Sequence, residues 1–191
     1  HEQALTSLRK KAAILVTTAL KESDLNESVA ATVTGGKGVI DEKTLRKITL
    51  AYGGDESVVG GAVLFLNKLD LIAFGDVRGT NEKKAVYEIE PDTDNPNTGI
   101  IKDGGLSVRY CINSNLTACA GTAQSASDTL TMFYGNPQCF ELDLFSDYEI
   151  RISEDFAFDK LMDTIRGDVE IGRDVVVKNG FVALKLPKSG S

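Results

Sequence analysis

The spacing of apolar residues near the N-terminus predicts a helix over residues 2–23. These residues recur at alternating three- and four-residue steps, which places them on one narrow face: Leu5, Leu8, Ala12, Leu15 and Ala19. The segment Ile14–Thr18 is rich in β-branched side chains and is also compatible with a strand. We favour the helix.

Two short helices and a buried strand are predicted next. After a loop at residues 34–38, Asp41 is expected to cap a helix that ends at Gly53-Gly54 and carries the apolar positions Leu45, Ile48 and Tyr52. The apolar run at residues 62–66 indicates a buried strand. Asn67, with Asp70 three residues later, predicts the N-terminal cap of a second helix, which closes at Gly75.

The middle of the chain alternates between turn-rich and β-rich segments. Residues 84–89 suggest a strand, whereas residues 90–99 are acidic and contain two prolines, which oppose regular structure. A hairpin is expected to pair Ile100-Ile101 with residues 106–112 around Asp103-Gly104-Gly105, and residues 129–134 suggest another strand. We expect the rest of 76–99, together with 113–128, to form exposed and mobile loops of small polar residues.

The last third of the chain reads as strands around one short helix. A Gly135-Asn136-Pro137 turn precedes two alternating strands, marked by Phe140, Leu142 and Leu144 and then by Tyr148, Ile150 and Ile152. A short helix is expected with Phe158, Leu161, Met162 and Ile165 on its apolar face. An Arg166-Gly167-Asp168 turn then leads to a last hairpin turned by Asn179-Gly180.

Composition narrows the class of protein. The 191 residues suit one domain, alone or with a smaller lobe, and 42% hydrophobic with 26% charged residues is typical of a soluble globular chain. A net charge of −7 argues against nucleic-acid binding through a general basic surface, although it allows a protein that encloses DNA without gripping it. No apolar run reaches the roughly 18–20 residues that span a bilayer, and we expect no signal peptide.

Cysteine and histidine usage removes several kinds of chemistry. Cys111, Cys119 and Cys139 are odd in number and lack CxxC spacing, which favours reduced, buried or half-buried thiols in an intracellular setting. One disulfide, or one reactive cysteine, remains the alternative. His1 is the only histidine, so a histidine base or an all-histidine metal site is excluded for practical purposes.

Two glycine- or oxygen-rich motifs resemble binding loops, but each is better explained as an ordinary turn or loop. Gly35-Gly36-Lys37-Gly38 lacks the Ser or Thr of a phosphate-binding loop, because Val39 follows, and we interpret it as a flexible turn. Residues 92–99 gather oxygen ligands as calcium loops do. An EF-hand would need different residues at the positions held by Pro96, Asn97 and Asp103, so we favour a solvated loop over a weak calcium site.

Acidic residues in the last third raise the possibility of a general acid and base pair, as in glycosidases: Asp143, Asp147, Glu149, Glu154, Asp155, Asp159 and Asp163. They alternate with hydrophobic residues, so most should face water, and the chain has no tryptophan for a sugar subsite. We therefore assign no catalytic, cofactor-binding or metal-binding residues and expect no cofactor.

The order of the elements resembles the major capsid proteins of tailed phages, those with the Hong Kong 97 (HK97) fold, over roughly residues 30–187. The residues that carry the resemblance are the helix after Asp41, the strand ending at Phe65-Leu66-Asn67, the turn Tyr134-Gly135-Asn136-Pro137, the segment Phe145-Ser146-Asp147-Tyr148, Ile165–Asp168 and the last strand at Phe181–Leu184.

The resemblance implies an α+β, HK97-like phage capsid fold: a mixed β-sheet axial domain with flanking helices, plus part of a peripheral domain with its spine helix. Residues 1–33 would be spine helix, 34–135 the axial domain, and 136–191 the return to peripheral-domain strands. It also implies a structural subunit, not an enzyme, that self-assembles into an icosahedral shell around DNA.

The implied partners are further copies of the chain, in the pentamers and hexamers of a capsid, together with scaffolding or portal proteins. Specific nucleic-acid binding and membrane association are not implied. The implied location is the virion capsid, assembled in the bacterial host cytoplasm.

The chain departs from the family in lacking counterparts of the extended N-terminal arm, the two-stranded E-loop and the scaffolding region. A looser loop at residues 34–38 replaces the family's Gly-Asp-Gly turn. We therefore expect a truncated or processed piece. An encapsulin-type nanocompartment shell protein and a non-capsid carbohydrate- or calcium-binding module are the alternatives.

Overall fold

One mixed sheet organises the molecule. The computed structural model describes residues 2–52, 60–79, 84–144, 149–153, 164–168 and 171–190. Its seven-stranded sheet has the order β1 (Glu27–Ala30), β13 (Phe181–Leu186), β8 (Thr129–Gly135), β4 (Val63–Leu66), β7 (Leu106–Ile112), β6 (Thr98–Asp103) and β5 (Glu88–Pro91). The pairs β1–β13 and β4–β7 are parallel and the others antiparallel.

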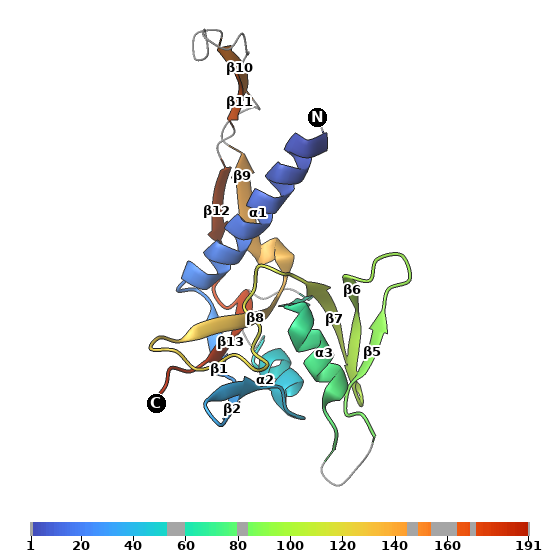
Figure 1. Ribbon diagram of the computed structural model, residues 1–191. Coiled ribbons are helices and arrows are strands. Elements are labelled where there is room, and N and C mark those ends of the chain that lie inside the picture. Colours follow the sequence, from blue (N-terminus) through green and yellow to red (C-terminus); the bar gives the residue numbers. More distant parts are fainter. Residues whose placement is uncertain are drawn as a thin grey trace.

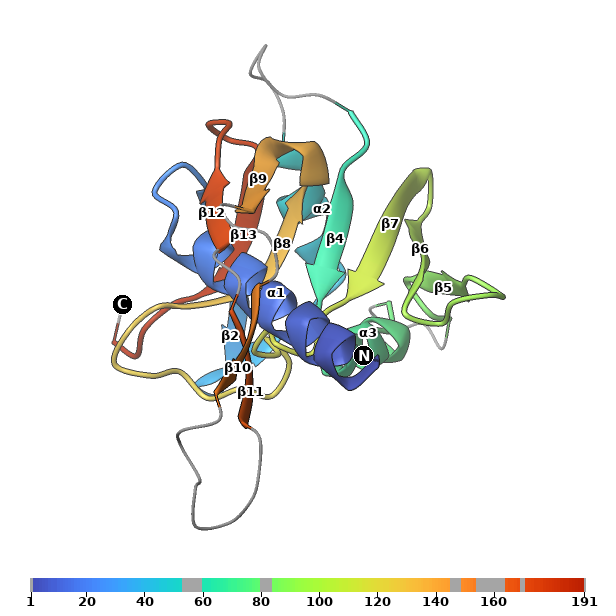
Figure 2. The ribbon, with the colours of Figure 1, turned by 90° about the horizontal axis from the view of Figure 1, so that it is seen from above.

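In the described part of the chain, three helices and three two-stranded pairs accompany this sheet. The helices are α1 (Glu2–Glu22), α2 (Thr44–Leu50) and α3 (Lys68–Asp76), and a 3₁₀ turn, η1, spans Pro137–Cys139. The pairs are β2 (Thr32–Thr34) with β3 (Lys37–Val39), β9 (Phe140–Leu144) with β12 (Ile171–Val175), and β10 (Glu149–Ser153) with β11 (Thr164–Asp168). The β9–β12 pair runs beside α1, and β10–β11 extends beyond it, away from the seven-stranded sheet (Figures 1 and 2). The fold is therefore α+β with a mixed sheet, as expected.

Both faces of the central strands are buried, because alternate side chains enter two different apolar clusters. Leu64, Met132 and Leu184 pack with side chains of α2 and α3, such as Ile48 and Phe74. On the same strands, the neighbouring residues pack toward α1 in a second cluster: Phe65, Phe133, Phe181 and Ala183, with Leu20 of α1. The sheet is thus a middle layer, covered by α1 on one face and by α2 and α3 on the other.

Helix α1 is confirmed, and its contact face differs slightly from the predicted one. Of the predicted face, Ala19 is buried, whereas Leu15 is half-buried and belongs to neither apolar cluster. The contacts with the second cluster come from Val16 and Leu20. Arg173 of β12 donates a hydrogen bond from Nη1 to the Leu15 carbonyl (3.0 Å), which ties the helix to the β9–β12 pair. The side chains of Leu5, Leu8 and Ala12 lie outside the described part of the chain.

The two predicted helix caps have different outcomes. Asn67 caps α3 as predicted, since its side chain accepts a hydrogen bond from the Leu69 amide at 3.0 Å. Asp41 is not the cap of α2, because a turn separates them and Lys43 occupies the cap position without a side-chain bond. Asp41 instead accepts hydrogen bonds from the Lys43 amide (2.9 Å) and the Thr44 hydroxyl (2.8 Å) within that turn.

Two loop predictions in the middle of the chain are wrong in part. Pro91 belongs to strand β5, which includes only the end of the predicted 84–89 strand. A proline is tolerated there because β5 is the edge of the sheet and needs hydrogen bonds on one side only. Segment 113–128 is not uniformly exposed, since Leu116 and Cys119 are buried, whereas residues 125–128 are exposed. The hairpin around Asp103-Gly104-Gly105 is confirmed.

The C-terminal third contains the predicted strands in a different arrangement. Ile165 and Arg166-Gly167-Asp168 lie in strand β11 rather than in a helix and a turn, while Phe158, Leu161 and Met162 lie outside the described residues. The Asn179-Gly180 turn exists, with Asn179 at φ 57°, but it does not close a hairpin. Both edges of β13 are occupied by β1 and β8, so β12 pairs with β9 instead.

Candidate functional site: an apolar groove beside helix α1

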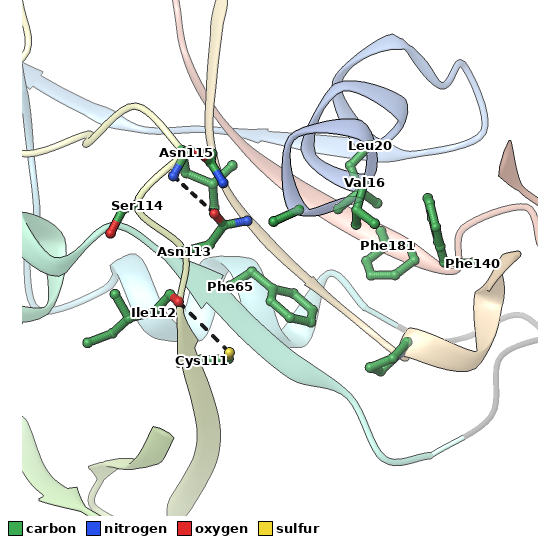
Figure 3. A pocket seen from close by; sticks show the side chains of 13 residues that line it. Val16, Leu20, Phe65, Cys111, Ile112, Asn113, Ser114, Asn115, Phe140 and Phe181 are labelled. Carbon is green, nitrogen blue, oxygen red and sulfur yellow. Dashed lines mark hydrogen bonds between the residues drawn. The ribbon is translucent and has the colours of Figure 1, made fainter. Parts of the chain in front are cut away.

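A groove of about 550 Å³ lies between α1 and the face of the sheet that α1 covers (Figure 3). Its lining comes from α1, β4, β7, η1, β9, β13 and the segment after β7: Ala13, Val16, Leu20, Phe65, Cys111, Ile112, Asn113, Ser114, Asn115, Leu116, Pro137, Phe140 and Phe181. Three phenylalanines from three separate strands line it, so the groove depends on the tertiary fold rather than on one local motif.

The alternation of β4 explains why Phe65 reaches the groove. Leu64 and Leu66 are fully buried on the side of α2 and α3, and Phe65 between them must point to the opposite face. Phe181 reaches the same face from β13, where it packs with the cluster under α1. A continuous apolar strand sequence thus supplies the core with one set of side chains and the groove with the other.

Amide side chains hold the wall formed by residues 113–116. Asn113 Nδ2 donates to Thr17 Oγ1 of α1 at 3.0 Å, and Asn113 Oδ1 accepts from the Asn115 amide at 3.0 Å. From the start of α3, Asn67 Nδ2 donates to the Leu116 carbonyl at 2.7 Å. These contacts join α1, α3 and the segment after β7 into one structure.

Cys111 contributes a neutral thiol to the groove. The side chain is half-buried, and burial raises the pKa of its thiol above the ordinary value. Its Sγ lies 4.0 Å from the Ile112 carbonyl oxygen, the only polar contact that Figure 3 marks for it. A thiol of raised pKa is a poor nucleophile at neutral pH, so Cys111 acts as part of the apolar wall.

The chemistry of the groove is that of a packing surface. None of the described residues that line it is Asp, Glu, Lys, Arg or His. A general acid and base pair needs two titratable groups that converge on one point, and the described lining offers only the Cys111 thiol. Apolar and aromatic side chains with a rim of amides suit the burial of another apolar surface.

The residues of the phosphate-loop motif form part of a β-hairpin. Gly35 and Gly36 have positive φ values (58° and 73°) and make the turn between β2 and β3, whereas Lys37 and Gly38 belong to β3. Gly38 packs so closely against Cys119 that a Cβ atom at position 38 would lie 3.0 Å from the Cys119 sulfur. The glycines therefore serve the turn and the packing of β3.

Two carboxylates of the calcium-loop motif, Asp92 and Asp103, make contacts within the protein. Asp92 accepts a hydrogen bond from the Thr98 hydroxyl at 2.7 Å across the β5–β6 loop. Asp103 lies at the far end of β6, where Arg46 of α2 pairs with it. Within the described part of the chain, no three Asp, Glu, His or Cys side chains gather as a metal site would require.

The acidic residues of the last third are distributed over separate elements. Asp143 belongs to β9 and Glu149 to β10, two strands of different two-stranded pairs. The other five lie outside the described residues: Asp147, Glu154, Asp155, Asp159 and Asp163. The three cysteines are free thiols, as predicted, with Cys111 half-buried and Cys119 and Cys139 buried.

Asp70 is a polar residue whose role sequence reasoning missed. Expected to support a helix cap, it is instead completely buried and accepts hydrogen bonds from the amides of Cys119 (3.1 Å) and Ala120 (2.8 Å). The spacing from Asn67 gave no sign of this role, because the role depends on a segment about 50 residues away.

Among the described helices, none is both long and apolar enough to cross a membrane.

Known protein structures with a similar fold are found, although no related sequence is. No family model and no curated protein sequence matches the chain. Two solved structures are similar: the capsid of the empty GTA (gene transfer agent) particle, with a TM-score of 0.55, and the capsid of the native GTA particle, with a TM-score of 0.59. Each is 12% identical over 85% of this chain, and the chain spans 50% and 54% of theirs, respectively. The chain therefore has a fold similar to that of these two GTA capsids.

Proposed function

We propose that this chain is a structural subunit of a capsid with the HK97-type fold, and that it has no enzymatic activity. The observation that carries the proposal is the match of 85% of the chain to two GTA capsids at TM-scores of 0.55 and 0.59. Copies of the subunit would assemble as pentamers and hexamers into an icosahedral shell around DNA, with scaffolding or portal proteins as further partners. The shell would be a virion capsid, assembled in the bacterial host cytoplasm.

The proposal also assigns the two domains of a capsid subunit to segments of the chain. Residues 1–33 would include the spine helix of the peripheral domain, residues 34–135 the axial domain, and residues 136–191 the strands that return to the peripheral domain. In support, α1 packs beside the β9–β12 pair, both of which would be peripheral, and β4 to β8 form most of the seven-stranded sheet. Strands β1 and β13, from the first and last segments, complete the same sheet, so the proposed segments meet within it. The HK97 arm and E-loop have no proposed counterpart among these residues.

Exposed apolar side chains support a role in subunit assembly rather than in catalysis. Two apolar side chains of α3, Leu69 and Ile72, are 53% and 61% exposed, and Ile14 of α1 is 51% exposed. Together with the uncharged groove, they give apolar surface that further copies of the chain can cover. Shell subunits need broad contact surfaces of this kind rather than a convergent polar pocket.

Electron microscopy of the full-length protein, expressed alone, tests the proposal. Closed icosahedral particles are the expected result, and a double Leu69→Asp, Ile72→Asp variant that stays folded should form fewer of them. A matched Lys68→Asp variant on the same helix changes charge without removing exposed apolar surface, and it should assemble normally. A protein that stays monomeric at all concentrations would contradict the proposal, and closed shells loaded with a cargo enzyme would favour a nanocompartment instead.

A further inference from the structure

Asp70 connects helix α3 to residues 116–122, a segment that also contacts β3 and lines the groove. Its two carboxylate oxygens accept separate hydrogen bonds from consecutive amides, those of Cys119 and Ala120. Both oxygens are thus used by one short stretch of backbone, and the side chain is completely buried. The contact closes residues 116–122 over the first turn of α3.

The same segment is attached to β3 and to the groove. The Gly38 amide donates to the Thr122 carbonyl and the Gly121 amide to the Gly38 carbonyl, both at 2.9 Å. At the other end of the segment, Leu116 lines the groove, and its carbonyl accepts a hydrogen bond from the Asn67 side chain. Of these attachments, only the one through Asp70 involves a group that gains or loses a proton between pH 4 and 8.

The surroundings of Asp70 leave its charge without a cation. Among the described residues, its carboxylate forms no ion pair with a lysine or arginine, and Lys68 and Asp76 on its own helix are exposed. The titratable group that faces it from the segment is the Cys119 thiol, which Asp41 from the β3–α2 turn also influences. Burial raises the pKa of that thiol to about 11, so it is neutral at physiological pH.

We propose that the contact between Asp70 and residues 119–120 is a pH-dependent clasp, which holds the segment closed in acid and lets it open more often at neutral pH. An ionised carboxylate loses most of its hydration on entering a site without a cation, and two neutral amides replace only part of it. When the segment opens, water reaches the carboxylate again, so ionisation favours the open state. Opening would also release the Leu116 wall of the groove.

The direction of the effect follows from the burial of Asp70. Burial raises the pKa of its carboxyl from 3.8 to about 6, even though the hydrogen bonds from Ala120 and Cys119 lower it. The closed state therefore binds the proton more tightly than the open one. By linkage, closing is most favoured below about pH 4 and loses this advantage as the pH rises through about 6.

Hydrogen exchange of the 191-residue protein tests the clasp. Protection of the Cys119 and Ala120 amides, corrected for the intrinsic pH dependence of exchange, should fall about tenfold from pH 5 to pH 8. Amides of β6 and β7, such as those of Ile101 and Val108, should show no such change. Asp70→Asn should remove the pH dependence at residues 119–120, whereas Asp103→Asn, a change at another buried carboxylate, should retain it.

A pH-independent protection of these two amides in the wild-type protein would overturn the proposal. If Asp70→Asn does not fold, the ¹³Cγ shift of Asp70 in the wild-type protein gives the answer directly. A midpoint near pH 6 supports the clasp, and a midpoint near or below pH 4 overturns it. The clasp does not depend on the proposed role in a shell, so either proposal can fail without the other.

Discussion

Arg46 and Asp103 form a two-point ion pair, with Nε 2.6 Å from Oδ2 and Nη2 2.8 Å from Oδ1. The side chain of Asp103 is 4% exposed and that of Arg46 is 54% exposed. The pair joins α2 to the end of β6, so it fixes a surface helix to the β6–β7 hairpin. A planar guanidinium matches a carboxylate in this geometry, which a lysine at position 46 would not reproduce.

Arg46→Ala is expected to lower the melting temperature by several degrees, because it leaves the buried Asp103 carboxylate without its cation. Lys102→Ala is the matched control. Lys102 pairs with Glu90 at 2.6 Å, but both of those side chains are substantially exposed, and such pairs add little to stability. Thermal unfolding followed by circular dichroism compares the two variants, and equal losses would show that the burial of Asp103 does not matter.

Gly135→Ala is expected to destabilise the fold by about 1–3 kcal/mol or more, because β8 and β13 approach too closely for a side chain there. A Cβ atom at position 135 would lie 2.8 Å from Phe181 Cα and would also meet the Gly180 carbonyl oxygen. Gly105→Ala is the control, since nothing lies within 4 Å of its Cβ position and its φ is not positive. Urea denaturation should separate the two, and a stable Gly135→Ala protein would contradict the observed approach of the strands.

Elements defined by local signals were predicted well from the sequence. Asn67 caps α3 because a side-chain oxygen followed by a helical run is a signal contained within a few residues. Gly104 likewise turns the β6–β7 hairpin with φ 59°, a conformation that glycine adopts readily. The order of strand and helix through residues 62–112 followed from such signals.

Features that depend on distant residues were not predictable in the same way. Residues 113–128 are small and polar, and nothing local shows that the Asp70 carboxylate will bury part of them. The Asn179-Gly180 turn has a hairpin sequence, which predicts that β12 pairs with β13. In the structure β1 and β8 occupy both edges of β13, and β12 pairs with β9. The groove was missed for a similar reason, since Phe65, Phe140 and Phe181 come from distant strands and meet only in the tertiary structure.

The stability of the protein should depend on pH through Asp70. The folded-state pKa of about 6 lies above the ordinary value of 3.8, so the folded state binds this proton more tightly than the unfolded chain does. The contribution is fully present below about pH 4 and is lost as the pH rises through about 6. The destabilisation caused by Asp70→Asn should therefore be about 2 kcal/mol larger at pH 4 than at pH 7.

Urea unfolding of the wild-type protein and Asp70→Asn at the two pH values measures this difference. Comparing the two proteins cancels the contributions of the other carboxylates, among them Asp128, whose pKa is lowered by the Lys188 amide and by Lys185. An Asp70→Asn effect that is the same at pH 4 and pH 7, or larger at pH 7, would contradict the raised pKa.

A short Gly-Ser insertion at Ser125 should cost less than about 1 kcal/mol, because the residue is exposed and loop lengthening has a slowly growing entropic cost. The same insertion between Ala183 and Leu184 should abolish folding, since β13 is paired on both sides and a shift moves its side chains to the wrong face. An insertion at Ile150 should have an intermediate effect, because β10 pairs with β11 and not with the seven-stranded sheet. Thermal unfolding gives the order of the three, and equal stabilities at positions 125 and 183 would contradict it.

The 191 residues alone are expected to remain monomers or small oligomers in dilute solution. They match only 50% and 54% of the two GTA capsid chains, so about half of each neighbour's chain lies outside the match. In a shell, the contact area is divided over many neighbours, and each stable contact needs roughly 1,000 Å² or more. Light scattering should therefore give a mass near 20.5 kDa or a small multiple of it. Closed particles of megadalton mass from these residues alone would contradict this prediction.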